Sequence, residues 1–203
     1  MVRIGISVEG LTEERFVKGV LAPHFSSQEI YVTPVQIQGN VSVDRIKGEL
    51  ERLAYSFDFV TTFYDFYGFK RKEAHETKVS LEVRIESSIK EGLREKLIPY
   101  IQMHEFEGLL FSAPGVIASV LQDENLEGWA GAILVDFDNN PEMINNLPET
   151  APSKRLIKQT SYRKTTHGPA IAEQIGLAKL REMCEGFHAW LARLEELGHS
   201  IDA

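Results

Sequence analysis

Three glutamates stand close together near the start of the chain, in the segment Val-Glu-Gly-Leu-Thr-Glu-Glu at residues 8 to 14. The apolar run Val2 to Val8 leads into this segment and predicts a buried strand. Glu9 therefore falls at the carboxyl end of that strand, where open α/β sheets place their sites. Carboxylate oxygens are ligands that suit Mg²⁺ or Mn²⁺, so the segment is a candidate metal site.

The residues after Glu9 predict a sharp turn and a helix. Gly10 lets the backbone turn, and Thr12 is expected to cap a helix that opens with Glu13 and Glu14. Acid in a first helical turn favours the helix dipole without any ligand, which is a second explanation for Glu13 and Glu14. Glu9 precedes the helix and has no such role, so it is the stronger functional candidate.

The elements that must position these residues follow from the hydrophobic pattern. Strands are predicted over residues 2–8, 30–37, 57–64 and 97–103, and the second has Pro34, which favours a sheet edge. Helices are predicted between them, the first of which ends around Pro23. This alternation predicts an α/β fold with a mostly parallel four-stranded sheet flanked by helices.

The second half of the chain has a different pattern. Strand signals fade after residue 112, and apolar residues from Leu180 to Leu197 recur at helical spacing. We therefore expect an α/β domain over residues 1–112 and a helical C-terminal portion over residues 113–203 packed on it. Cys184 falls on the helical stripe and is expected in the core.

Acidic residues end three of the four predicted strands. Glu9 follows the first, Asp65 the third, and Glu105 or Glu107 the fourth. In a parallel sheet these ends meet at one edge, where carboxylates so close would take up protons unless a cation compensated them. His104 is either a further ligand or a hydrogen-bonded structural residue.

Composition excludes several other classes of protein. No apolar run approaches the roughly 18 residues of a membrane span, and the start lacks a signal-peptide pattern. A single cysteine excludes an internal disulfide and a thiolate metal cage, and fits a cytoplasmic protein. A glycine-rich phosphate loop of the Walker type is also missing, which argues against an autonomous nucleotide hydrolase.

Positive charge is concentrated in one stretch, although the net charge is −8. No acidic residue lies between Glu149 and Glu173, and Tyr162 offers a face for base stacking. A basic stretch on an acidic protein can bind a polyanion, and the alternative is a solvated helix surface. The candidate nucleic-acid ligands are Lys154, Arg155, Lys158, Arg163 and Lys164.

Four motifs carry a resemblance to a known family. They are Val-Glu-Gly-Leu-Thr-Glu-Glu at 8–14, Asp-Phe-Tyr-Gly-Phe at 65–69, His-Glu-Phe-Glu at 104–107 and Pro-Ser-Lys-Arg-Leu at 152–156. In this order they resemble the domain-of-unknown-function family 4276. That family is similar to the Toprim fold of topoisomerases, bacterial primases and overcoming-lysogenisation-defect nucleases.

The resemblance implies a set of site residues. Glu9 and Glu13 match an acidic pair that holds Mg²⁺ for phosphoryl transfer, and Asp65 matches the first aspartate of an Asp-x-Asp motif. Tyr67 replaces the second aspartate. Either Glu105 or Glu107 supplies the missing carboxylate, or one metal binds, or activity has been lost. Lys154 falls where some Toprim nucleases carry a lysine near the scissile phosphate, which makes it a candidate catalytic residue beside Glu9.

The resemblance also implies a function. A Toprim-type nuclease would use Mg²⁺ or Mn²⁺ to hydrolyse phosphodiesters, in DNA rather than RNA. Such proteins often work beside an ABC-type or AAA-type ATPase in bacterial defence against phage or foreign DNA. The alternative is a non-catalytic partner that keeps the fold to bind an ATPase or nucleic acid, and Tyr67 and the acidic net charge support it.

Overall fold

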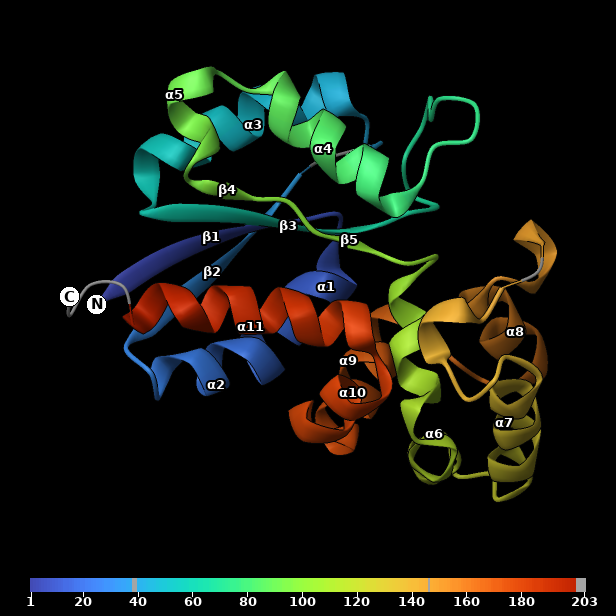
Figure 1. Ribbon diagram of the computed structural model, residues 1–203. Helices are drawn as coiled ribbons and strands as arrows, with labels where there is room; N and C mark the ends of the chain where they lie inside the picture. The colour runs from blue at the N-terminus through green and yellow to red at the C-terminus, as the bar shows by residue number, and fades with distance from the viewer. Residues whose placement is uncertain (38–39, 146, 200–203) are drawn as a thin grey trace.

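The computed structural model describes residues 1–37, 40–145 and 147–199 of the chain. A parallel sheet runs through its centre (Figure 1), with the strand order β2-β1-β3-β4 and a short β5 that also pairs with β3. The strands are β1 Val2–Val8, β2 Ile30–Gln36, β3 Phe59–Asp65, β4 Leu97–Ile98 and β5 Ile101–Gln102. The expected α/β fold with four parallel strand positions is therefore confirmed.

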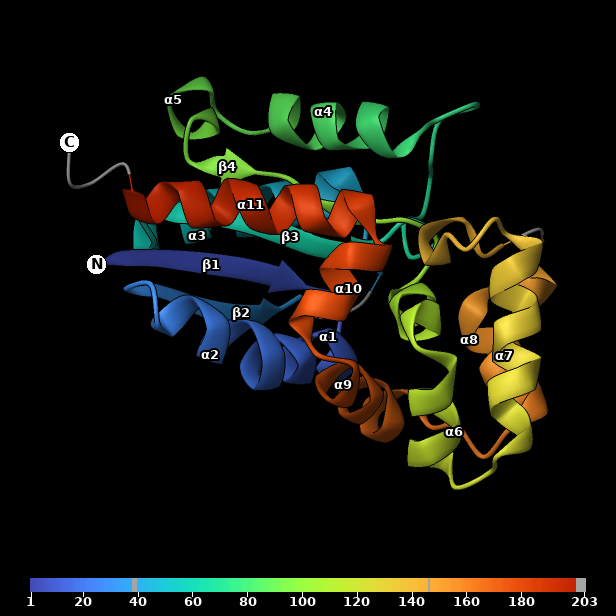
Figure 2. The ribbon, with the colours of Figure 1, turned by 60° about the horizontal axis from the view of Figure 1, so that its bottom comes forward.

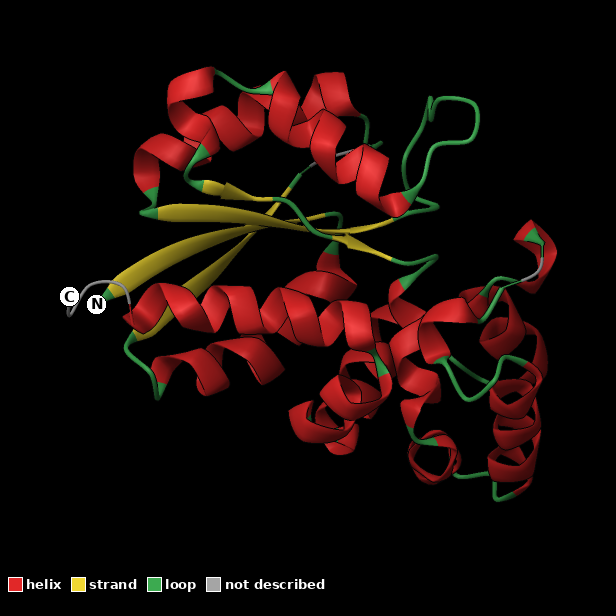
Figure 3. Cartoon of the chain, in the orientation of Figure 1, coloured by secondary structure: helices red, strands yellow, loops and turns green. Residues whose placement is uncertain are grey.

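Helices cover both faces of the sheet (Figure 3), with α3, α4 and α5 on one face and α2 and α11 on the other. The helices of the first half are α1 Leu11–Phe16, α2 Ala22–Ser26, α3 Val43–Ser56, α4 Lys78–Ser88 and α5 Glu91–Arg94. A 3₁₀ segment, η2 Phe106–Ser112, leads into the second half. The helices there are α6 Pro114–Leu121, α7 Asn125–Asp136, α8 Pro152–Gln159, α9 Lys164–Ile175, α10 Leu177–Met183 and α11 Glu185–His199, with short 3₁₀ turns η3 Pro141–Met143 and η4 Pro148–Thr150.

The first helical run is longer than the sequence predicts. It continues from α1 through a π-helical turn, η1 Val17–Leu21, into α2 and ends at Ser26 instead of near Pro23. Proline has no amide hydrogen to donate, and its ring clashes with the preceding turn of a regular α-helix. The wider π-helical turn ends two residues before Pro23. The hydrogen-bond pattern of the helix therefore changes just before the residue that cannot donate an amide hydrogen.

The predicted fourth strand is broken into β4 and β5. Pro99 lies between them and cannot donate to the ladder. Thr62 of β3 replaces the missing pairs, since its Oγ1 accepts from the Tyr100 amide at 2.8 Å and donates to the Tyr100 carbonyl at 2.7 Å. Both short strands therefore keep their place beside β3. Pro34 lies on β2, which is an edge strand as predicted.

Two apolar cores flank the sheet, and the helical C-terminal portion completes one of them. Among the described residues, the buried side chains of the core under α3 and α4 come from the segment between Ile37 and Ile101. The other core combines β1 and β3 with α11, where Trp190 stacks on Phe63 at 5.3 Å and its indole donates to Thr61 Oγ1 at 2.8 Å. Cys184 is buried in this core, as expected, at the break between α10 and α11. Figure 2 shows α11 lying along the sheet, with α6, α7 and α8 beyond its carboxyl edge.

Candidate active site at the carboxyl edge of the sheet

Glu9 directly follows β1 and lies against the turn that follows β3. The turn is closed by a hydrogen bond from the Gly68 amide to the Asp65 carbonyl at 2.9 Å. A Cβ atom at Gly68 would collide with Glu9 Oε2, so the glutamate side chain packs on the bare backbone of Gly68. Among the described residues, none donates a hydrogen bond to the Glu9 carboxylate. Both of its oxygens are therefore left for an external partner.

Glu13 has both a structural contact and a place in the site. Helix α1 begins two residues earlier than predicted, at Leu11 instead of Glu13, because Gly10 and not Thr12 is its N-cap. Glu13 is consequently the third helical residue, and its Oε2 accepts from the Gly10 amide at 3.0 Å. Thr12 is buried and lies where a Cβ at Gly168 of α9 would touch it at 3.3 Å. Helices α1 and α9 therefore pack closely at Thr12, next to the buried Glu13.

Asp65 ends β3 and is tied to the segment after β5. Its Oδ1 accepts from the Phe106 amide at 2.7 Å, which joins the two strand ends. The segment turns at His104, which adopts a left-handed backbone conformation with φ 59°. That turn places Glu105 and Glu107 at the same edge as Asp65, as their positions after the fourth strand predict.

Glu105 and Glu107 are held by different neighbours. Glu105 Oε2 accepts from the Ser153 amide at 2.9 Å, at the start of α8. Glu107 is almost fully buried, and its Oε1 accepts from the Tyr162 hydroxyl at 3.2 Å. Lys164, the first residue of α9, places its ammonium 3.4 Å from the same oxygen. The basic stretch thus contributes one lysine to the carboxylate site.

The charges of these side chains act on one another. Burial raises the pKa of Asp65 well above its usual range, and the charges of Glu13 and Glu107 raise it further. Burial also raises the pKa of Glu13, and Glu9 adds to that rise. Burial raises the pKa of Glu107, against the opposing pull of Lys164. The cluster therefore carries more negative charge than its surroundings stabilise, as the sequence predicts for carboxylates at three strand ends.

Two lysines partly compensate this charge. Burial raises the pKa of Glu9, whereas Lys164 and Lys70 lower it. Burial alone would lower the pKa of Lys164, but the charges of Glu107 and Glu105 outweigh it and leave that pKa raised. Lys164 is therefore a protonated cation at neutral pH, in contact with the cluster.

The donor set suits a hard divalent cation, although its ligands are not already gathered around one point. Carboxylate oxygens with raised pKa values are the groups that Mg²⁺ or Mn²⁺ would compensate. In the part of the chain that the structure describes, no three His, Cys, Asp or Glu side chains are arranged as the ligands of one ion. Neither oxygen of Glu9 accepts a hydrogen bond from a described residue, whereas Glu13, Asp65 and Glu107 each use at least one oxygen in a hydrogen bond within the protein. A metal ion would therefore have to draw the side chains together.

The remaining cations of the basic stretch lie outside this group. Lys154 and Lys158 are exposed on α8, and Arg163 is exposed just before α9. Arg155 donates to the Thr150 carbonyl at 2.7 Å. The structure thus brings Lys164, and not Lys154, to the carboxylates. The expectation that Tyr162 offers a stacking face is wrong, because its ring is buried and its hydroxyl is bonded to Glu107.

Tyr67 and His104 pack on each other beside the site. Their ring centroids are 5.2 Å apart, and the Tyr67 hydroxyl accepts a hydrogen bond from the Asn145 side chain. Burial lowers the pKa of His104 and raises that of Tyr67, so both rings are neutral at pH 7. His104 Nδ1 is buried and has no hydrogen-bond partner among the described residues. A neutral phenol tied to an amide does not replace the carboxylate expected at Tyr67.

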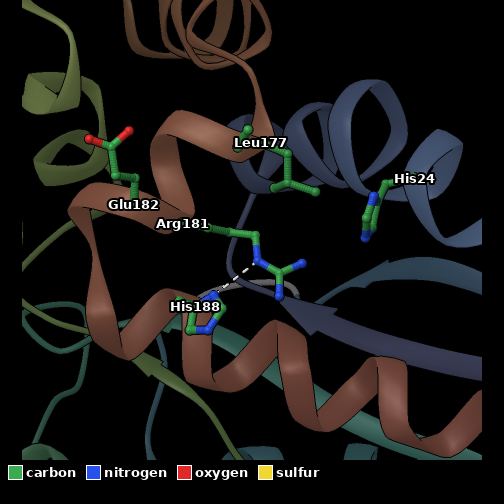
Figure 4. Close-up of a pocket in the computed structure, with 6 residues that line it drawn as sticks. His24, Leu177, Arg181, Glu182 and His188 are labelled. Carbon is green, nitrogen blue, oxygen red and sulfur yellow. Dashed lines mark hydrogen bonds between the residues drawn. The ribbon is translucent and has the colours of Figure 1, made fainter.

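A separate hollow of 530 Å³ lies between α2 and α10 (Figure 4) and is not part of this site. Arg181 lies between His188 and His24 there and donates to His188 Nδ1 at 3.0 Å. Its guanidinium also forms two hydrogen bonds to Glu195, at 2.5 and 2.9 Å, and His24 contacts the same carboxylate at 2.7 Å. The polar groups of this hollow therefore bind α2, α10 and α11 to one another.

The fold and site define an α/β protein with an acidic cluster at the carboxyl edge of a parallel sheet. The chain belongs to the family described as "Domain of unknown function (DUF4276)", whose model matches residues 8–195. No curated protein matches the chain. A solved structure described as the C-terminal region of the Xanthomonas campestris pv. campestris OLD protein is similar, with a TM-score of 0.46 and 14% identity over 98% of both chains. Among the residues described, no helix is long and apolar enough to cross a membrane.

Proposed function

We propose that the protein is a nuclease that hydrolyses phosphodiesters with Mg²⁺ or Mn²⁺. The observation that carries this proposal is the meeting of Glu9, Asp65 and Glu107 at one sheet edge with a protonated Lys164 beside them. A bound divalent cation would polarise a phosphate and lower the pKa of a water molecule. The candidate ligands are Glu9, Glu13, Asp65, Glu105 and Glu107.

The chain's own residues would supply the rest of the chemistry. The Glu9 carboxylate has unengaged oxygens and a raised pKa, so it suits either metal binding or removal of a proton from the attacking water. The Lys164 ammonium would offset the charge that develops on the phosphate in the transition state. Its ion pair with Glu107 holds the ammonium in place.

The family resemblance supports the wider setting. We propose DNA, rather than RNA, as the substrate, and an ABC-type or AAA-type ATPase as a partner in cytoplasmic defence against phage or foreign DNA. These proposals rest on the resemblance of the motifs. The hydrogen bonds and ion pairs described above support the metal site, and they do not bear on the substrate or the partner.

A non-catalytic role is the second candidate. Tyr67 stands where the resemblance implies a second aspartate, and its hydroxyl is tied to Asn145. Without that carboxylate the fold would serve to bind an ATPase or nucleic acid. The two candidates differ in whether metal-dependent cleavage occurs.

Cleavage of supercoiled plasmid tests the choice. With Mn²⁺ the wild-type protein should produce nicked or linear DNA, and Glu9→Gln should abolish it. Glu14→Gln is the matched control, because Glu14 lies in the same helix but pairs with Lys18 and Gln36 instead of the cluster. No cleavage of DNA or RNA by the wild type, even with its ATPase present, would favour the non-catalytic role.

A further inference from the structure

A second hollow, of about 220 Å³, lies between α7 and α8. Trp129 and Ile133 of α7 line one side, and Lys154, Arg155 and Lys158 of α8 line the other. The indole of Trp129 packs against Phe111, with ring centroids 6.0 Å apart, and this half-buried residue lines the hollow. The fold thus pairs an aromatic surface with a row of cations.

The two lysines of this hollow are available to bind an anion. Lys154 and Lys158 are four residues apart on α8, so they share one face of the helix. Both are exposed, and neither forms an ion pair with any described residue. Glu149 is the acidic residue at the rim. Arg155, by contrast, is engaged with the Thr150 carbonyl and the Phe137 ring.

The hollow is connected to the carboxylate site through the start of α8. Ser153, whose amide donates to Glu105 at 2.9 Å, directly precedes Lys154 in the chain. A strand bound at the carboxylates would therefore reach Lys154 first and Lys158 one helical turn later. The volume is below the roughly 300 Å³ at which pockets for larger ligands begin, and it suits one base better than a whole nucleotide.

We propose that this hollow binds an unpaired base of a nucleic-acid strand, with the base on Trp129 and the adjoining phosphates at Lys154 and Lys158. This inference rests on the proposed function and specifies the substrate as a strand with unpaired bases. A base within a duplex is stacked on its neighbours and presents no free face to an indole, whereas a single strand does.

Binding without cleavage provides the test. A fluorescently labelled deoxythymidine oligomer is titrated into the protein in the presence of EDTA, and its anisotropy is measured over a salt series. Trp129→Leu should weaken binding about tenfold. Lys154→Ala with Lys158→Ala should lower the salt slope by about 1.4, the value for two phosphate contacts on a single strand. Lys47→Ala with Lys90→Ala is the control for the loss of two positive charges, since these exposed lysines lie on or beside α3 and α5, away from α7 and α8.

Tryptophan fluorescence adds a direct signal. The chain has two tryptophans, and Trp190 is buried between α11 and the sheet, so quenching by unlabelled oligomer should come from Trp129. Unchanged affinity in folded Trp129→Leu and in the double lysine variant would overturn the proposal. It would also be overturned if a duplex bound as tightly as the oligomer and the oligomer did not quench the tryptophan fluorescence. Normal oligomer binding by these variants together with Glu9-dependent cleavage would reject the hollow and keep the nuclease. Quenching of Trp129 without any cleavage would support strand binding at the hollow and reject the nuclease activity.

Discussion

The ammonium of Lys164 lies 3.4 Å from Glu107 Oε1, an ion pair between the first residue of α9 and the segment that follows β5. The Glu107 side chain is 2% exposed, whereas that of Lys164 is 42% exposed, so the lysine reaches the buried acid from the open side of the site. A substrate phosphate that approached the carboxylates would meet the same ammonium.

Replacement of Lys164 should therefore impair cleavage more than replacement of Lys154. Loss of a charge that stabilises the transition state typically lowers the rate by about 10²–10³-fold, and we expect Lys164→Ala to do so. Lys154→Ala should weaken substrate binding and leave the rate at saturating substrate unchanged. Single-turnover cleavage rates, measured over a range of substrate concentrations, give the effect of each variant on binding and on the rate. Lys164→Arg is the control and should retain part of the activity, because it keeps the positive charge. Equal rates for Lys164→Ala and the wild type would remove Lys164 from the mechanism.

A methyl group at Gly68 should disturb Glu9 without unfolding the protein. The added Cβ would collide with Glu9 Oε2, so Gly68→Ala must displace that carboxylate. We expect a cleavage rate at least tenfold lower, with a small change in melting temperature. Gly48→Ala is the control, since nothing lies within 4 Å of its added Cβ in α3, and alanine there should stabilise the helix by about 1 kcal/mol. Normal activity in Gly68→Ala would show that the position of Glu9 is unimportant.

The acidic cluster should make metal-free protein less stable as the pH rises. The pKa of Asp65 is raised in the folded state, so the folded protein keeps a proton that the unfolded chain releases from about pH 4 upward. The contribution of Asp65 to the free energy of unfolding therefore decreases as the pH rises above about 4 and toward the raised pKa of the folded state. Asp65→Asn removes this group and keeps the acceptor for the Phe106 amide.

Melting temperatures measured in EDTA between pH 4 and pH 8 compare the two proteins. Relative to wild type, Asp65→Asn should become progressively more stable toward pH 8. A constant difference between the two curves would mean that Asp65 is ionised throughout and that the carboxylates do not repel one another as described.

The sequence predicts the sheet and its acidic edge because both follow from local patterns. An apolar run that ends in Glu9 or Asp65 places an acid at a strand end in any parallel arrangement. The role of Lys164 could not be read in the same way, because it depends on how α9 packs against α1. Gly168 of α9 permits that packing, since a Cβ there would lie only 3.3 Å from Thr12 of α1.

The sequence also could not show which aromatic residue is partly exposed beside the basic stretch, because this too depends on how the helices pack. Tyr162 lies within the stretch and was expected to stack on bases, but its contact with Glu107 buries it. Trp129 is about 25 residues away in the chain and reaches Lys154 and Lys158 only through the pairing of α7 with α8. A hydrophobic pattern shows which residues are buried, and it does not show which helix a given face meets.

Titration of the protein with Mn²⁺ by isothermal calorimetry tests the central claim most directly, because it measures the metal site without requiring a substrate. The wild type should show saturable binding that is lost in Glu9→Ala and greatly weakened in Asp65→Asn. Asp58→Asn is the matched control, since Asp58 lies at the opposite end of β3 and pairs with Arg3. It should bind Mn²⁺ as the wild type does. Absence of binding by the wild type, or equal binding by all four proteins, would contradict the assignment of a metal site to this edge of the sheet.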